Sequence, residues 1–406
     1  MVDGLRREGG ILIRSGWWLV AMPALWMPVA GCREAEAPAA RPAAATAESI
    51  AVAVTPALAT DALPRDPDDP AIWVNHADPS KSLVLGTMKV AAPDGALAVF
   101  GVDGKLRHLL KGADRPNNVD VEYGLDLDAT PTDVAVLTER LVRRLRVYAI
   151  AADGSGLRDI SSGQMPVLAG AAGDQGAPMG IGLYRRAKDG AIFAIISPKA
   201  GPKTNYLWQY LLEDDGTGRV KATFVRRFGT FSGVGEIEAV AVDDELGYVY
   251  YADEDAGIHK WPADPDAPDA NRELALFGAT GYEQDREGLG IYTLPGGKGY
   301  IVSVDQLPGE SVFHVYRREG EPGRPHDHSA MLLSFKGGAD STDGLDVTSA
   351  ALGPTFPDGA LIAMNSARRN FLYYRWRDVA AAASPPLTSA GIVDRSTAVF
   401  SQIGRP

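Results

Sequence analysis

The sequence contains only one cysteine, Cys32, among 406 residues, so no disulfide can form within a single chain. The fold must therefore be stabilised by its apolar core or by bound metal. Three common motifs are also missing: the Gly-x-Ser-x-Gly elbow, the phosphate-binding loop that ends in Gly-Lys-Ser/Thr, and the Gly-x-Gly-x-x-Gly turn. These absences exclude the hydrolase and nucleotide-binding classes that depend on those motifs.

Histidine is scarce as well, with six residues, of which only His326 and His328 lie close together. They fall in a segment rich in Pro and Gly, which favours a polar loop over a zinc site. The Arg-His-Gly signature of histidine acid phosphatases is missing. A phosphatase chemistry based on a histidine nucleophile is therefore not expected.

The N-terminus has the organisation of an export signal. Arg6, Arg7 and Arg14 precede an apolar stretch at 17–30 that is too short, and too interrupted by proline, to span a membrane. It ends in Val-Ala-Gly-Cys32, which resembles the bacterial lipobox. We predict a lipoprotein-type signal peptide at 1–32 with lipidation at Cys32; the alternative is an ordinary signal peptide with a chance cysteine. No thiol remains after cleavage, which excludes a cysteine nucleophile.

The segment 33–50 is rich in Ala and Pro without apolar periodicity, so we expect a disordered tether. Arg33 follows the cysteine where the inner-membrane retention rule needs Asp, so we expect an outer-membrane or cell-surface lipoprotein, or otherwise a periplasmic or secreted protein. The net charge of −12 disfavours nucleic acid and anionic lipid as partners. Membrane contact is expected only through the lipid anchor, and the protein is expected to be a monomer.

One pattern recurs along 51–406: an apolar strand, a polar turn, and a second strand that ends in an aromatic residue. No convincing amphipathic helix occurs beyond about residue 60, and the aromatic ends recur at a spacing of roughly 50 to 60 residues. Each repeat has room for four strands, which predicts an all-β, six-bladed β-propeller rather than a large sandwich or a pair of barrels. The six hairpins are 83–100, 134–148, 192–210, 248–261, 300–316 and 361–376.

Acidic motifs lie beside or between these predicted strands. Calcium takes six to eight oxygen ligands, which loops from several blades could supply at one channel mouth. Each motif by itself is typical of an ordinary polar turn, and their comparable positions on the blades favour a metal site. The motifs are Asp66-Pro-Asp68-Asp69, Asn117-Asn118-Val119-Asp120, Glu236-Ile237-Glu238 with Asp253-Glu254-Asp255, Asp285-Arg286-Glu287, and Asp340-Ser341-Thr342-Asp343-Gly344-Leu345-Asp346.

Three basic residues, Lys89, Arg140 and Lys199, occupy polar turns between paired strands. Arg binds phosphate as a planar fork and Lys as a point charge, so these residues opposite a carboxylate cage would suit phosphate recognition. From this arrangement we predict metal-activated attack of water on a phosphomonoester, with Glu254 orienting or deprotonating the water.

The same motifs resemble the β-propeller phytases, which are calcium-dependent alkaline phytases of the 3-phytase type. The resemblance runs from about Asp66 to Trp376 through DPDDPAIWV, RPNNVDVEYGL, EIEAVAVDDELGYVYYADEDAGIHKW, DREGLGIY and STDGLDVTSAALGP. It implies an enzyme that needs several calcium ions and hydrolyses phytate, or its calcium complex, to lower inositol phosphates and inorganic phosphate.

The resemblance also implies roles for individual residues. Lys89, Arg140 and Lys199 match the phosphate-binding cations, and Gln306 matches a polar neighbour of the active site. The calcium ligands implied by the motifs are Asp68, Asp69, Asn118, Asp120, Glu238, Glu254, Asp285, Glu287, Asp343 and Asp346.

The chain departs from the family pattern at three positions, Val90, Met179 and Ala239, where the family often has Lys, Tyr and Gly, and its Asp340/Ser341 slot is shifted. These departures bear on phosphate affinity and substrate range. Two other function classes stay open: a calcium-stabilised binding propeller on the cell surface, and a metal-dependent lactonase. The three cations argue against a pure binding propeller, and the number of carboxylates exceeds what a single-metal lactonase needs.

Overall fold

The computed structural model describes residues 51–389. The chain divides into two units, Met1–Glu48 and Ser49–Pro406. The predicted signal peptide at 1–32, its Cys32, and the predicted tether at 33–50 lie outside the described residues.

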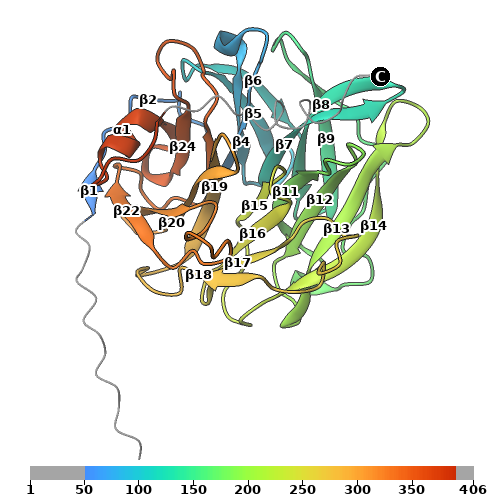
Figure 1. The fold of residues 1–406 in the computed structure, drawn as a ribbon. Coiled ribbons are helices and arrows are strands. Elements are labelled where there is room, and N and C mark those ends of the chain that lie inside the picture. Colours follow the sequence, from blue (N-terminus) through green and yellow to red (C-terminus); the bar gives the residue numbers. More distant parts are fainter. Residues whose placement is uncertain (1–50, 390–406) are drawn as a thin grey trace, which may run out of the picture. The chain divides into compact units, whose positions relative to one another are not determined.

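The described residues form six sheets, each a blade of a β-propeller, as Figure 1 shows. In the picture β7, β11, β15 and β19 lie near the middle, whereas β14 and β22 lie at the periphery. Blade 1 contains β3 (Pro67–Trp73), β4 (Leu83–Met88), β5 (Ala96–Gly101) and β6 (Leu106–Lys111). Blade 2 contains β7 (Pro116–Leu127), β8 (Thr130–Glu139), β9 (Arg144–Ile150) and β10 (Leu157–Asp159).

The next two blades follow in chain order, again with antiparallel neighbours. Blade 3 contains β11 (Pro178–Arg185), β12 (Ile192–Pro198), β13 (Thr204–Asp214) and β14 (Val220–Thr230). Blade 4 contains β15 (Val240–Asp243), β16 (Tyr248–Asp253), β17 (Gly257–Pro262) and β18 (Ala275–Phe277).

The last two blades incorporate the first strands of the described chain. Blade 5 contains β19 (Arg286–Leu294), β20 (Lys298–Asp305), β21 (Val312–Arg317), β22 (Met331–Lys336) and β1 (Val52–Ala53). Blade 6 contains β23 (Leu345–Thr348), β24 (Ala360–Asn365), β25 (Asn370–Arg375) and β2 (Leu58–Ala59). Short helices are η1 (Pro79–Lys81), η2 (Gly173–Gly176), η3 (Ser366–Arg368) and α1 (Trp376–Ala381).

The predicted six-bladed propeller is therefore confirmed. Each predicted hairpin forms the second and third strands of one blade, beginning with β4–β5 and ending with β24–β25. One boundary differs: the last hairpin stops at Arg375, and Trp376 begins α1, a short helix that the repeat pattern did not predict. Trp376 stacks on Tyr292 with ring centroids 4.0 Å apart, so this aromatic residue packs into the core from outside the strand.

The core lies between the blades rather than within them. Six apolar clusters occur among residues 51–389, and each combines residues of two adjacent blades. Because both faces of a blade pack against neighbours, strands such as β4 and β12 are buried along their whole length. This explains why they read as continuous apolar runs instead of alternating patterns.

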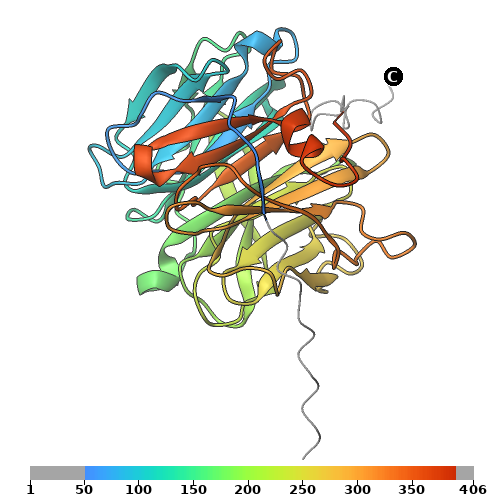
Figure 2. The ribbon, with the colours of Figure 1, turned by 90° about the vertical axis from the view of Figure 1, so that its left-hand side faces the viewer.

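The ring is closed by strands from both ends of the domain. β2 pairs with β25, so the outermost strand of blade 6 comes from the N-terminal side of blade 1. β1 extends blade 5 by pairing in parallel with β22. Figure 2 shows blade 6 (red) beside blade 1 (blue), with the N-terminal segment crossing over the red strands. Two-residue strands of this kind are too short to show a periodicity, so the sequence does not predict them.

None of the helices between residues 51 and 389 combines the length with the apolar character that spanning a bilayer requires.

Candidate functional site

The predicted site residues gather at one end of the central channel. The first strand of each blade begins at this end, and the antiparallel second strand ends there. Asp68 and Glu287 therefore come from strand starts, whereas Lys89, Arg140 and Lys199 directly follow strand ends. We call this group of side chains the rim cluster; it consists of Asp68, Lys89, Asn117, Arg140, Lys199, Glu236, Glu238, Glu254, Glu287, Gln306 and Asp343.

The inner strands of four blades share the same irregularity at this end. In β3, β7, β11 and β19 the register shifts by one residue over the first four positions, as in a β-bulge. A bulge leaves one residue unpaired and redirects a side chain, and bulges are frequent beside active sites. The four bulges place Asp68, Asn117, Met179 and Glu287 at equivalent positions of successive inner strands.

Lys89 lies between two carboxylates of the rim cluster. Its Nζ forms an ion pair with Asp68 and lies 3.2 Å from Asp343 Oδ2. The other oxygen of Asp343 accepts a hydrogen bond from the amide of Gln306. Burial by itself would lower the pKa of Lys89, but the nearby carboxylates outweigh it and raise the pKa, so Lys89 is a cation.

Arg140 belongs to a second group, in which Asn117 bridges blade 2 to blade 4. Asn117 Nδ2 donates to Glu238 Oε2 at 3.1 Å and to Asn118 Oδ1 at 2.7 Å. The guanidinium of Arg140 donates a hydrogen bond to the side-chain oxygen Oδ1 of Asn117, and its Nη2 lies 3.5 Å from Glu238 Oε1. Asn117 thus contacts blade 4, whereas Asn118, the predicted calcium ligand of this motif, hydrogen-bonds with Asp69 of blade 1. Its assignment as a ligand stays a prediction.

Lys199 forms an ion pair with Glu236 on the following blade. The backbone N–H of Glu236 donates to Glu254 Oε2 at 2.8 Å, and Arg286 Nη1 donates to the Glu254 carbonyl at 2.7 Å. Glu254 is therefore held from two sides, by a loop of blade 4 and by the start of β19. Burial raises the pKa of Glu254 to about 7, against the lowering effect of the Glu236 N–H, and the charge of Asp285 adds to the rise.

Glu287 and Asp285 lie on the blade 5 side of the site. Glu287 is buried, and its Oε2 has no hydrogen-bond donor among residues 51–389. Burial raises the pKa of Glu287 strongly, and the charges of Glu238 and Glu254 raise it further. Asp285 is exposed, and its backbone carbonyl accepts from Gln306 N at 3.0 Å.

A second group of predicted ligands lies deeper and connects neighbouring blades. Asp69, Asp120 and Asp346 each accept a hydrogen bond from the backbone of the next inner strand, so each carboxylate links two blades. The bonds are Val119 N to Asp69 Oδ2 (3.0 Å), Leu183 N to Asp120 Oδ2 (2.7 Å) and Ile72 N to Asp346 Oδ2 (2.8 Å). Their assignment as calcium ligands remains a prediction beside this observed structural role.

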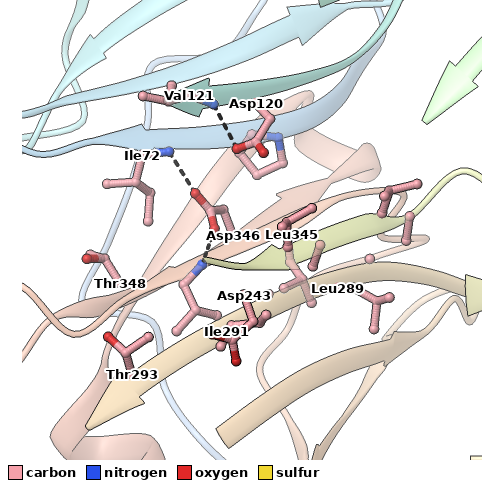
Figure 3. Close-up of a pocket in the computed structure, with 18 of the residues that line it drawn as sticks. Ile72, Asp120, Val121, Asp243, Leu289, Ile291, Thr293, Leu345, Asp346 and Thr348 are labelled. Atoms are coloured by element: carbon pink, nitrogen blue, oxygen red, sulfur yellow. Dashed lines mark hydrogen bonds between the residues drawn. The ribbon is translucent and has the colours of Figure 1, made fainter. Parts of the chain in front are cut away.

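These deeper residues line a cavity of about 90 Å³ in the channel. Figure 3 shows Asp120 beside Val121, and Asp346 between Ile72 and Leu345. Leu289 and Ile291 also line the cavity. Asp69 and Asn118 also line it, whereas Lys89, Arg140, Lys199 and Glu254 do not. The structure therefore separates the predicted set into the rim cluster, with the exposed Asp285 beside it, and a channel group of Asp69, Asn118, Asp120 and Asp346.

The rim cluster holds more buried negative charge than its cations balance. Burial raises the pKa values of Asp68 and Glu238, and the neighbouring carboxylate Asp343 adds to both rises. Asp68 Oδ2 is buried without a hydrogen-bond donor among the described residues. Such groups are costly unless they bind a cation or a proton.

The donor set fits calcium. Carboxylate and amide oxygens are the ligands that Ca²⁺ prefers, and the unpartnered oxygens of Asp68 and Glu287 offer lone pairs for coordination. Within residues 51–389, however, no three acidic, histidine or cysteine side chains converge as they stand on a single point. Lys89 and Arg140 lie between the carboxylates instead, so cation binding requires these ion pairs to rearrange.

The three departures from the family pattern have different surroundings. Val90 is half-buried against the core between blades 1 and 6. Met179 is fully buried at the bulge of β11, where its carbonyl accepts from Thr138 Oγ1 at 2.6 Å. Ala239 is buried and lines the channel cavity. Blade 3 thus presents an apolar side chain where its neighbours present oxygen atoms.

Two rim residues, Asn117 and Glu236, lie within the acidic motifs but are not among the predicted site residues. Asn117 is next to the predicted ligand Asn118, and Glu236 is two residues before the predicted ligand Glu238. The bulge of β7 and the loop before β15 place these side chains. The paired spacing Asn-Asn and Glu-Ile-Glu was the available signal, because it offers two candidate donors at each strand start.

Comparison with known proteins gives consistent results. A family model described as Phytase matches residues 22–382. The chain is 31% identical to the 3-phytase of Bacillus subtilis (strain 168) over 323 residues, which cover 77% of this chain and 80% of that protein.

Two solved structures also resemble the chain in shape. A chain of the mitotic checkpoint complex is 13% identical, with a TM-score of 0.43, over 86% of this chain and 98% of that chain. A DUF4623 family protein from Bacteroides eggerthii is 11% identical, with a TM-score of 0.46, over 76% of this chain and 70% of that chain. At these scores neither structure carries an argument about function.

Proposed function

This chain belongs to the phytase family and is an enzyme that hydrolyses phytate, and we propose that it does so as a calcium-dependent phosphomonoesterase with the rim cluster as its reaction centre. The observation that carries the proposal is the pairing of Lys89, Arg140 and Lys199 with carboxylates at one channel mouth. These cations match phosphate groups, and the carboxylates match metal ions.

Calcium would be held by the carboxylates of the rim cluster, with Asp68 and Glu287 offering the unpartnered oxygens. Glu238, Glu254, Asp285 and Asp343 complete the proposed ligand set at the rim, and the channel group adds a deeper set. When bound, calcium supplies positive charge against the phosphate and Lewis-acid stabilisation of the transferring group.

The three cations bind and orient the phosphate. Each is held in place by a carboxylate, and the ion pairs of Lys89 and Arg140 are largely buried. Exchange of these carboxylates from cation to metal would free the N–H donors to bind phosphate oxygens. The planar guanidinium of Arg140 can contact two oxygens at once, whereas Lys89 and Lys199 act as point charges. The cations thereby compensate charge on the transferring group.

Glu254 accepts a proton from the attacking water in this proposal. Its Oε2 accepts the Glu236 N–H, which fixes the orientation of the carboxylate. A general base works best when its pKa lies near the operating pH, and burial moves the pKa of Glu254 in that direction. No covalent phosphoenzyme is required, because water is the nucleophile.

The first experiment measures phosphate release from phytate with calcium, with a chelator, and after calcium is restored. We expect activity only in the presence of calcium and full recovery on restoring it. Unchanged release in the chelator would refute the metal mechanism. If calcium raised the melting temperature without any phosphate release, the protein would instead be a calcium-stabilised binding propeller.

The second experiment uses Glu254→Gln, which keeps the shape of the side chain but removes its basicity. Loss of a general base lowers kcat by about 10² to 10⁴-fold. Glu283→Gln is the matched control, because Glu283 is exposed on a nearby loop and has no place in the rim cluster. Equal activity of the two variants would remove Glu254 from the mechanism.

We also propose that the protein is exported and anchored through a lipid on Cys32. The support is the order of features in the sequence: arginines, a short apolar stretch and the Val-Ala-Gly-Cys box. Membrane fractions of the producing cells should contain the protein, and Cys32→Ala should release it. Fractionation that is unchanged by Cys32→Ala would contradict the anchor.

A further inference from the structure

Blades 2 and 3 enclose an arginine-walled recess on their outer strands. It has a volume of about 420 Å³ and is lined by Arg144, Arg146, Asp159, Ser161, Gly163 and Arg219. An isolated bridge between Ser161 and Val220 joins the two blades at this place. None of these residues lines the channel cavity or belongs to the rim cluster. The recess is therefore a separate feature, although Glu139 beneath it directly precedes Arg140 of the rim.

Two of the arginines are fixed by a fully buried carboxylate. Glu139 forms an ion pair with Arg144, and its Oε1 lies 3.1 Å from Arg146 Nη2. Glu139 also accepts the N–H of Asp114 at 2.8 Å. Arg146 Nη2 further donates to the Gly112 carbonyl at 3.0 Å. These contacts hold both side chains in place before any ligand arrives, which lowers the entropic cost of binding.

The third arginine approaches from blade 3. Arg219 Nη1 donates to the Ser161 carbonyl at 3.1 Å, and the side chain belongs to an exposed residue. A guanidinium carries five N–H donors in a planar fork, and the hydrogen bonds of these arginines do not use them all. Three such forks around one recess match the oxygens of a tetrahedral dianion.

One carboxylate opposes this match. Asp159 lies 3.9 Å from Arg146 Nε, and its Oδ1 accepts the Ser161 N–H at 2.9 Å. Asp159 and the buried Glu139 together carry two negative charges, whereas the three arginines carry three positive charges. The recess therefore keeps a surplus of positive charge, although the net charge of the chain is −12. Because Asp159 is on the wall of the recess, its charge should weaken anion binding without abolishing it.

We propose that this recess is a second anion site, which binds a phosphate monoester group outside the reaction centre. Its anion binding follows from the three arginines alone. That the anion belongs to the substrate or product of this enzyme rests on the proposed function. A molecule with several phosphate groups can occupy the recess beside the hairpin that carries Arg140, which raises its local concentration near the rim.

The test is calorimetric titration of the full protein with myo-inositol hexakissulfate, which presents tetrahedral anionic groups but is not a phosphate ester. We expect Arg219→Gln to weaken one class of binding sites about tenfold, because a charge-assisted contact is lost. Asp159→Asn should tighten the same class several-fold, because it removes the opposing charge and keeps the oxygen that Ser161 N–H needs. Neither variant disturbs the pairing of Glu139.

The matched control is Arg158→Gln, which removes an exposed arginine from β10 that does not line the recess. The proposal would be overturned in favour of non-specific attraction if Arg158→Gln and Arg219→Gln changed the affinity equally. An affinity that is unchanged by Asp159→Asn would overturn it as well. The experiment measures anion binding and not activity, so its result would hold even if catalysis did not require calcium.

A final arm separates two sources of the same chemistry. Vesicles of phosphatidylcholine containing phosphatidic acid present the phosphate monoester on a lipid. Vesicle binding that is lost in Arg219→Gln would assign the recess to a lipid headgroup. Soluble-ligand binding that is lost in Arg219→Gln, with no vesicle binding at all, would assign it to soluble phosphate esters.

Discussion

The residues at the four bulges show how one backbone position serves different chemistry in successive blades. Asp68, Asn117 and Glu287 present oxygen atoms at equivalent places, whereas Met179 presents an apolar side chain. The bulge in β11 also brings Gly180 so close to blade 4 that an added Cβ would lie 2.0 Å from the Glu238 carbonyl. Only glycine fits there, so the contact between blades 3 and 4 is part of what positions Glu238.

Arg318 is a buried residue on which stability should depend strongly. Its guanidinium is fully buried, and it donates to both oxygens of Asp243, at 2.6 Å and 2.5 Å, and to Glu245 at 2.9 Å. Arg318→Met would leave Asp243 buried without its partner, which costs about 3 to 5 kcal/mol. Urea unfolding should show this loss. The double variant Arg318→Met with Asp243→Asn should recover part of it, because the unpaired charge is gone; no recovery would contradict the charge argument.

At the scale of elements, the sequence predicted the middle of each blade and missed its edges. Hairpins such as β8–β9 have long apolar strands and a regular aromatic spacing, so they can be recognised from the sequence without knowledge of their neighbours. β1 and β2 are two residues long and pair with strands that lie far along the chain. The bulges likewise depend on the pairing register between two strands, and the sequence of one strand does not determine that register. The Asn117-Asn118 motif therefore does not by itself show that Asn117 reaches Glu238 on blade 4, and Asn118 stays the predicted ligand of this motif.

The N-terminal strands should contribute to stability by closing the ring. Val54 N, Ala57 N and Thr60 N donate to carbonyls of Lys336, Tyr373 and Phe371, and Val54 is buried in the core between blades 5 and 6. A chain that begins at residue 61 loses these contacts, whereas one that begins at residue 51 keeps them. At a net value of about 0.5 to 1.5 kcal/mol per hydrogen bond, the shorter chain should lose several kcal/mol in urea unfolding. Equal stability would show that β25 tolerates an open edge.

The segment between β21 and β22 should make stability sensitive to acid. His328 Nδ1 donates to the Arg317 carbonyl at 2.7 Å, so Nε2 can accept from Lys260 Nζ at 3.1 Å. Burial and the charge of Lys260 lower the pKa of His328 to about 4. In the unfolded chain His328 takes up a proton as the pH falls through the usual histidine pKa, near 6.5, whereas in the folded chain it stays neutral until about pH 4. The stability of the fold therefore falls as the pH is lowered from about 6.5 to about 4.

His328→Gln removes this titration. Between about pH 7.5 and about pH 4.5 the unmodified protein should lose roughly 2 kcal/mol more than the variant. Urea unfolding at both pH values measures the difference, and His314, whose pKa burial also lowers, is present in both proteins and cancels. Parallel pH profiles of the two proteins would refute the role of His328.

For the whole molecule, the fold concentrates negative charge at one end of the channel. Asp69, Asp120 and Asp346 use carboxylates to link the blades, and the rim cluster adds buried Asp68 and Glu287. These groups repel one another in a protein that already has a net charge of −12. The arrangement costs folding free energy unless a cation is bound, so metal binding and blade closure should be linked.

Because of this linkage, a substitution of Glu287 should change the melting temperature in opposite directions with and without calcium. Its Oε2 is buried without a hydrogen-bond donor among the described residues. Calcium at a hundredfold excess over its Kd should stabilise the unmodified protein by about 2.7 kcal/mol for each site. Glu287→Gln removes a repelling charge, so it should raise the melting temperature in chelator. It also removes a proposed ligand, so it should lower the melting temperature in calcium. Thermal unfolding of both proteins in both buffers measures the crossover. A variant that is destabilised equally in both would show that Glu287 acts through packing and not through charge.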